Sequence, residues 1–174
     1  PWLRFIRERI PVNVEIFEQF SKEPIPHHMK IWWYCLGGTP LILFAILVVT
    51  GILLTFYYEA SPAQAWDSVR RISEEVPFGW WIRSVHHWSA NLMIIAVILH
   101  LARVFFTGAY RKPRELNWVV GAGLLCVTLG FGFTGYALVY DQLSYWAATV
   151  GINVAGQVPL VGPWIANLMR GGAD

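Results

Sequence analysis

The sequence predicts an all-α transmembrane helix bundle with three spans and additional short surface helices. Apolar residues make up 56% of its 174 residues and charged residues only 14%, whereas soluble domains carry about 25% charged residues. Three stretches carry no charge, and each is close to or above the roughly 20 residues needed to cross a membrane. With their aromatic flanks, they define predicted spans at residues 31–58, 80–106 and 116–140.

A fourth charge-free stretch, residues 142–169, is not predicted to be a further span. It contains residues that break a continuous helix, namely Gly151, Gly156, Pro159, Gly162 and Pro163. Two short surface helices at about 143–150 and 160–169 fit this pattern better. We expect the whole segment 141–174 to lie along one membrane face or to line a pocket there.

Basic residues predict the orientation of the chain. They are concentrated in residues 1–30 and in the loop 107–115, whereas the loop 59–75 holds four acidic residues and two arginines. The positive-inside rule places the first two segments on the cytoplasmic side and the segments 59–75 and 141–174 on the electropositive side. Within residues 1–30, alternating charged and apolar positions favour an amphipathic surface helix, with a solvated tail as the alternative.

The second span contains His86, His87 and His100, and ionisable residues inside a span are functional candidates. His86 and His100 are fourteen residues apart, so they point the same way to within about 40°, whereas His87 points about 140° away from His100. The rise between His86 and His100 is about 21 Å, too far to share one metal ion. The pair predicts two haems stacked across the membrane. A hydrogen bond to a neighbouring helix is the alternative for a lone histidine.

Glycines repeat with the same fourteen-residue spacing in the other two spans, as Gly37 and Gly51 and as Gly121 and Gly135. Glycine lets a flat macrocycle approach the backbone where a Cβ would collide. Small-residue packing between helices explains a single glycine, but not one spacing on three helices. The glycines therefore support two haem sites.

Two arginines flank the histidines. Arg83 lies three residues before His86, and Arg103 lies three residues after His100. Each is about one turn further outward and is placed to pair with a haem propionate. Snorkelling to the lipid headgroups is the alternative for either side chain.

In combination, four features resemble cytochrome b of the Rieske/cytochrome b complexes. They are the run from Arg83 to His86, His100, the paired glycines and the segment 112–116 (Lys-Pro-Arg-Glu-Leu). The resemblance runs from about Trp2 to Arg170 and includes the segment 134–142. It implies a four-helix bundle with two b haems, in which His86 and His100 are axial ligands and Arg114 is a further haem-binding residue.

The segment 34–38 (Tyr-Cys-Leu-Gly-Gly) is most similar to the split form of the family, cytochrome b6. In that form, a cysteine at this position holds a third haem through a single thioether bond. The resemblance therefore implies that Cys35 carries a third haem beside the one at His100. Judged without the resemblance, a cysteine in an apolar segment is an inert packing residue, and we keep that interpretation for Cys126.

The resemblance also implies a reaction. Quinol would be oxidised near the electropositive face, in a pocket with Tyr136 and Asp141 at its edge. One electron would pass to a Rieske iron–sulfur protein and on to a c-type cytochrome or a small copper protein. The other would cross through the two haems to quinone near the cytoplasmic face, coupled to proton translocation. The chain would then belong to a dimeric complex in a bacterial inner or photosynthetic membrane.

The sequence departs from the family at three places. Residues 138–142 read Leu-Val-Tyr-Asp-Gln where the family usually has Leu-Pro-Trp-Asp-Gln, and His87 stands where arginine is frequent. The family also has a fourth helix with two partner histidines, followed by a quinol-binding C-terminal half. We expect both from a longer chain or a separate subunit, because His27 and His28 precede the first span in a polar stretch. Without them, we expect this chain not to hold its haems tightly.

Two other functions compete with this prediction. A di-haem, quinone-reactive anchor of a dehydrogenase or hydrogenase would also carry paired histidines, but the glycine spacing and Cys35 argue against it. A haem-free membrane scaffold would be colourless when purified. A soluble enzyme is excluded by the three spans, and a net charge of +2 spread over short loops offers no nucleic-acid surface.

Overall fold

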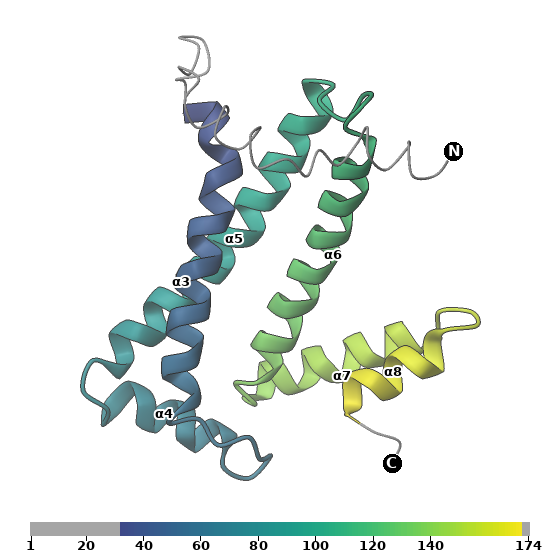
Figure 1. Ribbon diagram of the computed structural model, residues 1–174. Helices are drawn as coiled ribbons and strands as arrows, with labels where there is room; N and C mark the ends of the chain where they lie inside the picture. Colours follow the sequence, from purple (N-terminus) through teal and green to yellow (C-terminus); the bar gives the residue numbers. More distant parts are fainter. Residues whose placement is uncertain (1–31, 172–174) are drawn as a thin grey trace. The chain divides into compact units, whose positions relative to one another are not determined.

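The structure, a computed structural model, describes residues 32–171, with no side chains described at 32–34. Its elements are η2 (Trp32–Gly37), α3 (Gly38–Thr55), α4 (Ala65–Glu74), α5 (Gly79–Phe106), α6 (Glu115–Ala137), α7 (Gln142–Gly156) and α8 (Gly162–Arg170) (Figure 1). The described residues form no strand, so the predicted all-α class is confirmed. The predicted surface helix within residues 1–30, together with His27 and His28, lies outside the described residues.

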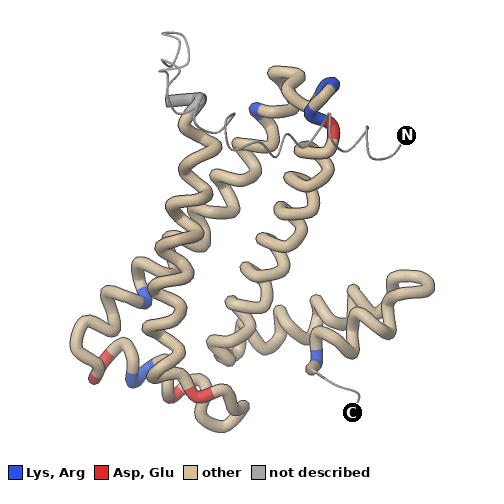
Figure 2. Tube along the Cα trace, viewed as in Figure 1, with Lys and Arg blue, Asp and Glu red and all other residues tan. Residues whose placement is uncertain are grey.

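Three helices are long and apolar enough to cross a membrane, at Cys35–Thr55, Gly79–Phe106 and Glu115–Ala137. They correspond to the three predicted spans. Figure 2 shows the charged residues at helix ends and connections, with the middle turns of α3 and α6 free of charge. This distribution keeps Lys, Arg, Asp and Glu out of the middle turns of α3 and α6, where charged groups are costly in a membrane.

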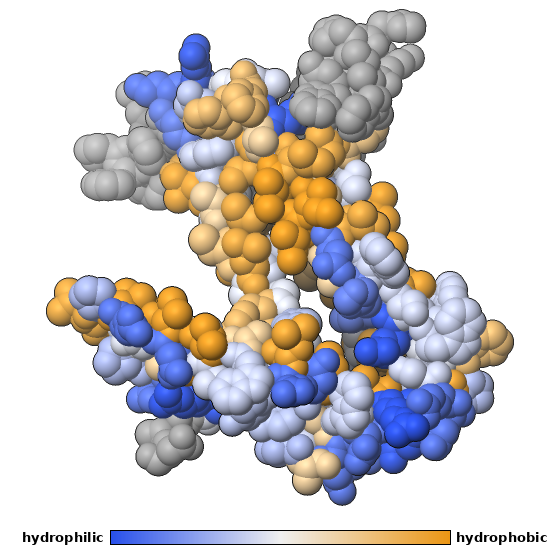
Figure 3. All heavy atoms as spheres, turned by 180° about the vertical axis from the view of Figure 1, so that it is seen from behind, coloured by the Kyte–Doolittle hydropathy of each residue, from blue (hydrophilic) through white to orange (hydrophobic). Residues whose placement is uncertain are grey.

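Few apolar side chains are buried within the described part of the chain. Those below a tenth exposed are Leu36, Ala65, Val69, Ile72, Ala96 and Ala166. The larger apolar side chains of the spans mostly remain on the surface, and Figure 3 shows broad apolar areas there. A helix that is apolar on all sides needs lipid or other protein around it, so these faces are suited to a membrane and not to water.

The chain forms two compact units, and each contains part of all three spans. Among the described residues, one unit comprises 32–46 and 89–128, and the other comprises 47–88 and 129–171. In the first unit, aromatic side chains hold the connection between α5 and α6. Phe105 stacks on Tyr110 with ring centroids 5.8 Å apart, and Trp118 packs 5.7 Å from Tyr110. Such rings are common at the membrane interface.

In the second unit, the connection between α3 and α5 contains α4, a helix that the sequence analysis did not predict. Its apolar residues Ala65, Val69 and Ile72 are spaced by four and three, and all three are buried. Arg71 and Glu59 form an ion pair at 2.7 Å across the same connection. The apolar spacing is the signal that could have revealed this short amphipathic helix.

The two surface helices after α6 pair with each other, α7 leading through a turn into α8 (Figure 1). α7 continues past Gly151, where a helix break was expected. Phe133 occupies the space that a side chain at Gly151 would take. A Cβ at Gly151 would lie 2.5 Å from the Phe133 ring. α8 ends at Gly171, whose φ of 84° is the left-handed conformation that glycine adopts at helix C-termini.

Gly162→Ala is expected to destabilise the α7–α8 pair, because a Cβ there would collide with the backbone carbonyl of Gly156. Overpacking of this kind costs about 1–3 kcal/mol, so amide hydrogen exchange over residues 142–170 should become faster. Gly130→Ala in α6 is the control, since no described atom outside its own helix backbone and chain neighbours lies within 4 Å of that Cβ position. Equal exchange in both variants would contradict the proposed packing.

Candidate functional site

His86 lies in the second unit, where α5 contacts α3. Its Nδ1 is 2.8 Å from the hydroxyl oxygen of Thr50, a residue only 7% exposed. The next residue of α3 is Gly51, and a Cβ there would lie 3.4 Å from Cε1 of the His86 ring. One edge of the imidazole therefore packs against α3, where it meets the Thr50 hydroxyl and the backbone of Gly51.

His100 lies in the first unit and has a related but different environment. A Cβ on Gly37 would lie 3.4 Å from Cε1 and 3.8 Å from Nδ1 of its ring. The Nδ1 atom is buried and has no hydrogen-bond partner within the described range 32–171. The glycine contact is thus repeated at both histidines, whereas the hydroxyl contact is made at His86 alone.

The two glycines of α6 have open surroundings. The closest atom to a Cβ on Gly121 would be Leu101 Cδ1, at 4.0 Å. At Gly135, no atom of residues 32–171 outside the local helix backbone lies within 4 Å. Gly37 and Gly51 therefore let a helix approach an imidazole, while Gly121 and Gly135 leave room beside the backbone for a flat group.

The three predicted arginines lie near the ends of the spans (Figure 2). The Arg83 guanidinium is exposed and donates a hydrogen bond to the Ser73 hydroxyl of α4, at 3.2 Å. Arg103 is partly buried in the last turn of α5. Arg114 is exposed just before α6, and its backbone N–H donates to the Arg111 carbonyl at 3.0 Å. All three cations are accordingly away from the middle of the hydrocarbon region.

Cys35 is an exposed free cysteine in η2, two residues before Gly37. Its backbone carbonyl accepts a hydrogen bond from the Thr39 hydroxyl at 3.2 Å. Cys126, in the middle of α6, is also exposed and free. Among residues 32–171, no group of three or more His, Cys, Asp and Glu side chains could hold a metal ion. His86 and His100 are each single donors.

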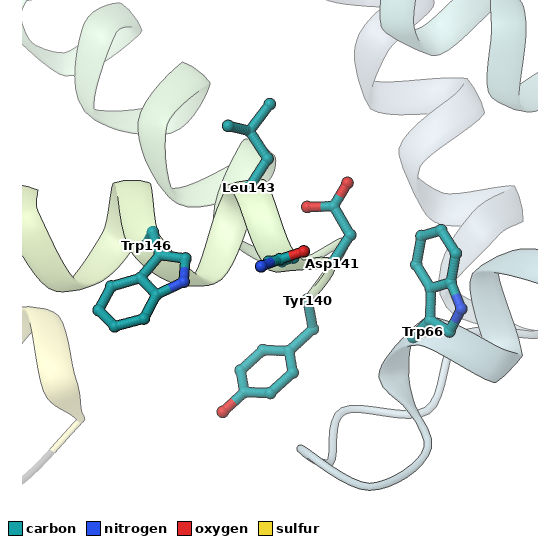
Figure 4. Close-up of a pocket in the computed structure, with 6 residues that line it drawn as sticks. Trp66, Tyr140, Asp141, Leu143 and Trp146 are labelled. Atoms are coloured by element: carbon teal, nitrogen blue, oxygen red, sulfur yellow. The ribbon is translucent and has the colours of Figure 1, made fainter.

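A cavity of ≈ 730 Å³ lies in the second unit at the start of α7 (Figure 4). It is lined by Trp66, Tyr140, Asp141, Gln142, Leu143 and Trp146. Figure 4 shows Trp66 of α4 facing Tyr140 and Asp141 across the opening. Asp141 thus lies at this pocket, whereas Tyr136 is an exposed residue of α6 outside its lining.

Asp141 also begins α7. Its carboxylate accepts a hydrogen bond from the Ser144 backbone N–H at 2.7 Å, which is N-cap geometry. This bond, with further help from the Ser144 hydroxyl, holds the pKa of Asp141 below its usual value. The residue before it, Tyr140, has a φ of 55°, a left-handed conformation that a tyrosine adopts only under constraint. The backbone is therefore sharply turned where the pocket begins.

The family model described as "Cytochrome b/b6/petB" matches residues 20–174. The chain belongs to the cytochrome b/b6 family. It is 47% identical over 170 residues to a cytochrome b6 of Heliobacterium mobile, covering 98% of this chain and 80% of that one. With a cytochrome b6 of Gloeobacter violaceus it shares 44% identity over 169 residues, covering 97% and 78%.

A solved chain titled "Hyperthermophilic respiratory Complex III" is similar in structure to this cytochrome b/b6 family member. The TM-score is 0.77 at 32% sequence identity, and the match covers 98% of this chain and 46% of the solved one. The chain thus spans about half the length of that solved chain. The resemblance that the sequence motifs indicated is confirmed by both kinds of comparison.

Family membership makes this chain an integral membrane protein that binds b-type haem. The described residues fit such a group. Two partly buried imidazoles lie in one span, and the space beside Gly121 and Gly135 is open to a flat macrocycle. Sequence reasoning missed Thr50 and Trp66. Trp66 belongs to the unpredicted α4, and threonine in a membrane helix is usually taken as bonded only to its own backbone.

Asp141→Ala should destabilise the first turn of α7, because alanine cannot cap it. Asp141→Asn should retain the cap, because the asparagine side chain also accepts a hydrogen bond from the Ser144 N–H. Faster amide exchange at residues 142–146 in the alanine variant alone is the expected result.

Since the folded pKa of Asp141 is lowered, the carboxylate cap is complete above the usual aspartate pKa and is lost as pH falls through the lowered value. Exchange that already increases on titration from pH 8 to 6 would contradict this assignment.

Proposed function

We propose that this chain is the haem-bearing subunit of a quinol-oxidising, bc-type oxidoreductase complex. The observation that carries the proposal is a pair of imidazoles fourteen residues apart on one membrane span, each beside a glycine: Gly51 of α3 at His86 and Gly37 of η2 at His100. The cytochrome b6 relatives favour this function over a di-haem anchor of a dehydrogenase or hydrogenase. A bundle completed by a fourth helix would enclose both sites.

His86 and His100 would each provide one axial nitrogen to a b haem, and partner histidines would come from the fourth helix. When bound, the two haems supply one-electron transfer across the membrane, from a quinol oxidation site to a quinone reduction site, coupled to proton translocation. The chain's own contribution is to orient the two ligand rings by contact with η2 and α3. It also insulates them with the apolar side chains of the spans.

The three arginines have a separate task in this proposal. Arg83, Arg103 and Arg114 would receive propionates near the membrane surfaces, where a guanidinium forms strong paired hydrogen bonds with a carboxylate. The Ser73 hydroxyl already holds the Arg83 side chain toward α4. That contact restricts the arginine before any propionate is bound.

Quinol would bind at the electropositive face, with the cavity at the start of α7 as the edge of its site. The cavity offers aromatic rings and one carboxylate, Asp141, and apolar pockets with a few polar groups are typical of small-molecule sites. Tyr136 would approach the same site from α6. Tyr140 and Val139 replace the tryptophan and proline usual in the family, so the rim here has a different shape.

Further subunits complete this assembly. A Rieske iron–sulfur protein and a c-type cytochrome would accept electrons, and a longer chain or another subunit would supply the fourth helix and the C-terminal half. The complex would be dimeric and lie in a bacterial inner or photosynthetic membrane. The basic loop 107–115 and the N-terminus would face the cytoplasm.

His86→Ala and His100→Ala should each remove one of the two b haems from the purified complex, because each deletes one axial ligand. His87→Ala is the matched control, since its ring is exposed and packs edge-on against Trp88 with centroids 6.2 Å apart. Haem per polypeptide is measured as the pyridine haemochrome. Full haem content in both ligand variants would exclude the proposed sites.

Cys35 is proposed to hold a third haem through one thioether bond, which its exposure and its position next to Gly37 support. A denaturing gel stained for haem peroxidase activity should show a band for this chain, because only covalently attached haem survives denaturation. The band should disappear in Cys35→Ser and persist in Cys126→Ser. An unstained wild-type band with a b-type spectrum would remove the third haem and leave His86 and His100 as ligands.

A further inference from the structure

We propose that Thr50 is a positioning residue for His86, whose hydroxyl fixes the imidazole tautomer and lowers the reduction potential of the haem bound there. This inference rests on the proposed function, because it takes His86 as a haem ligand. It goes beyond that function by assigning a role to a residue of α3 that contacts the ligand and not the iron. It also predicts that the two haem sites are tuned differently.

The Thr50 hydroxyl lies between two partners. It is 3.3 Å from the backbone carbonyl of Leu47, one turn earlier in α3, to which it donates, and 2.8 Å from Nδ1 of His86. A hydroxyl that gives its one proton to the carbonyl accepts from the imidazole, and this is the arrangement that the proposal takes. Nδ1 of His86 then carries a hydrogen. The neutral ring keeps its lone pair on Nε2, the atom that is left to bind iron.

Burial makes this contact effective. Thr50 is 7% exposed, and a hydrogen bond shielded from water is electrostatically stronger than an exposed one. The Gly51 contact holds the same ring from the adjacent position. The imidazole is therefore restrained in both rotation and tautomer before a haem arrives.

His100 provides an internal comparison within the same helix. Fourteen residues before Thr50 the chain has Leu36, a buried aliphatic residue without a hydroxyl. The Nδ1 atom of His100 is buried without a hydrogen-bond partner in the described residues. The glycine repeat is kept between the two sites, but the threonine is not.

A hydrogen bond donated by Nδ1–H increases the basicity of a ligating imidazole. A more basic ligand stabilises the oxidised iron more than the reduced iron, so the potential falls; hydrogen bonding around the ligand is one of the ways a protein sets haem potential. Removing the hydroxyl should therefore raise the potential at His86. A threonine that served only helix packing would not change it.

The test is a redox titration of both b haems in the purified complex, with low-spin ferric signals recorded by electron paramagnetic resonance. Thr50→Val removes the hydroxyl at nearly constant volume, and Thr50→Ser keeps it. Thr55→Val is the matched control, because the Thr55 hydroxyl also bonds a carbonyl three residues earlier, that of Ile52, but the residue is exposed and lies in another turn. The haem lost from His86→Ala identifies which signal belongs to His86.

In Thr50→Val, the reduction equilibrium of the His86 haem should shift up to about tenfold toward the reduced form, and a tenfold shift is 59 mV for one electron. The potential of the His100 haem should not change in this variant, and neither haem potential should change in Thr50→Ser or Thr55→Val. Selective loss of the His86 haem from Thr50→Val, with both haems kept in Thr55→Val, would support the same role. Equal potentials in Thr50→Val and Thr55→Val would overturn it. If His86→Ala keeps both haems, the proposed function itself fails.

Discussion

The contact of η2 and α3 with two imidazoles of α5 is the constraint on which the rest of the structure depends. A helix returns to nearly the same direction after fourteen residues, so His86 and His100 face one side of α5. Gly37, the last residue of η2, and Gly51 of α3 have the same spacing, and a Cβ at these positions would lie 3.4 Å from Cε1 of His100 and of His86, respectively. The backbone of this segment therefore lies close to both rings.

This constraint also explains why the described chain buries so little of its own apolar surface. Helices that present ligands to a large flat group cannot close on one another at the same place, and Gly121 and Gly135 indeed face open space. The buried apolar residues lie mainly where no such group is expected, as with Val69 and Ile72 under α4. Membrane lipid, haem and further helices would cover the remaining apolar faces in the proposed complex.

Much of this arrangement could be predicted from the sequence, because charge-free length and helical period are strong signals. The spans, the ligand pair and the glycine repeat all follow from spacing. α4 was missed because its apolar pattern covers fewer than three turns. The continuation of α7 past Gly151 was missed because a glycine was taken as a break, although a single glycine only weakens a helix. The packing of Gly151 against Phe133 of α6 is a tertiary contact, which no single-sequence pattern reveals.

Thr50 could not be predicted for a different reason. The site residues were predicted from a fourteen-residue repeat, and Thr50 does not belong to that repeat. The fourteen-residue symmetry makes the two histidine sites alike in backbone, and the change from Leu36 to Thr50 makes them unlike in hydrogen bonding. In the proposed electron path, the site at His86 donates to the site at His100. Such transfer is downhill when the donor has the lower potential, and a hydrogen-bonded, more basic imidazole lowers the potential of its iron. This difference in hydrogen bonding therefore acts in the direction in which electrons are proposed to move.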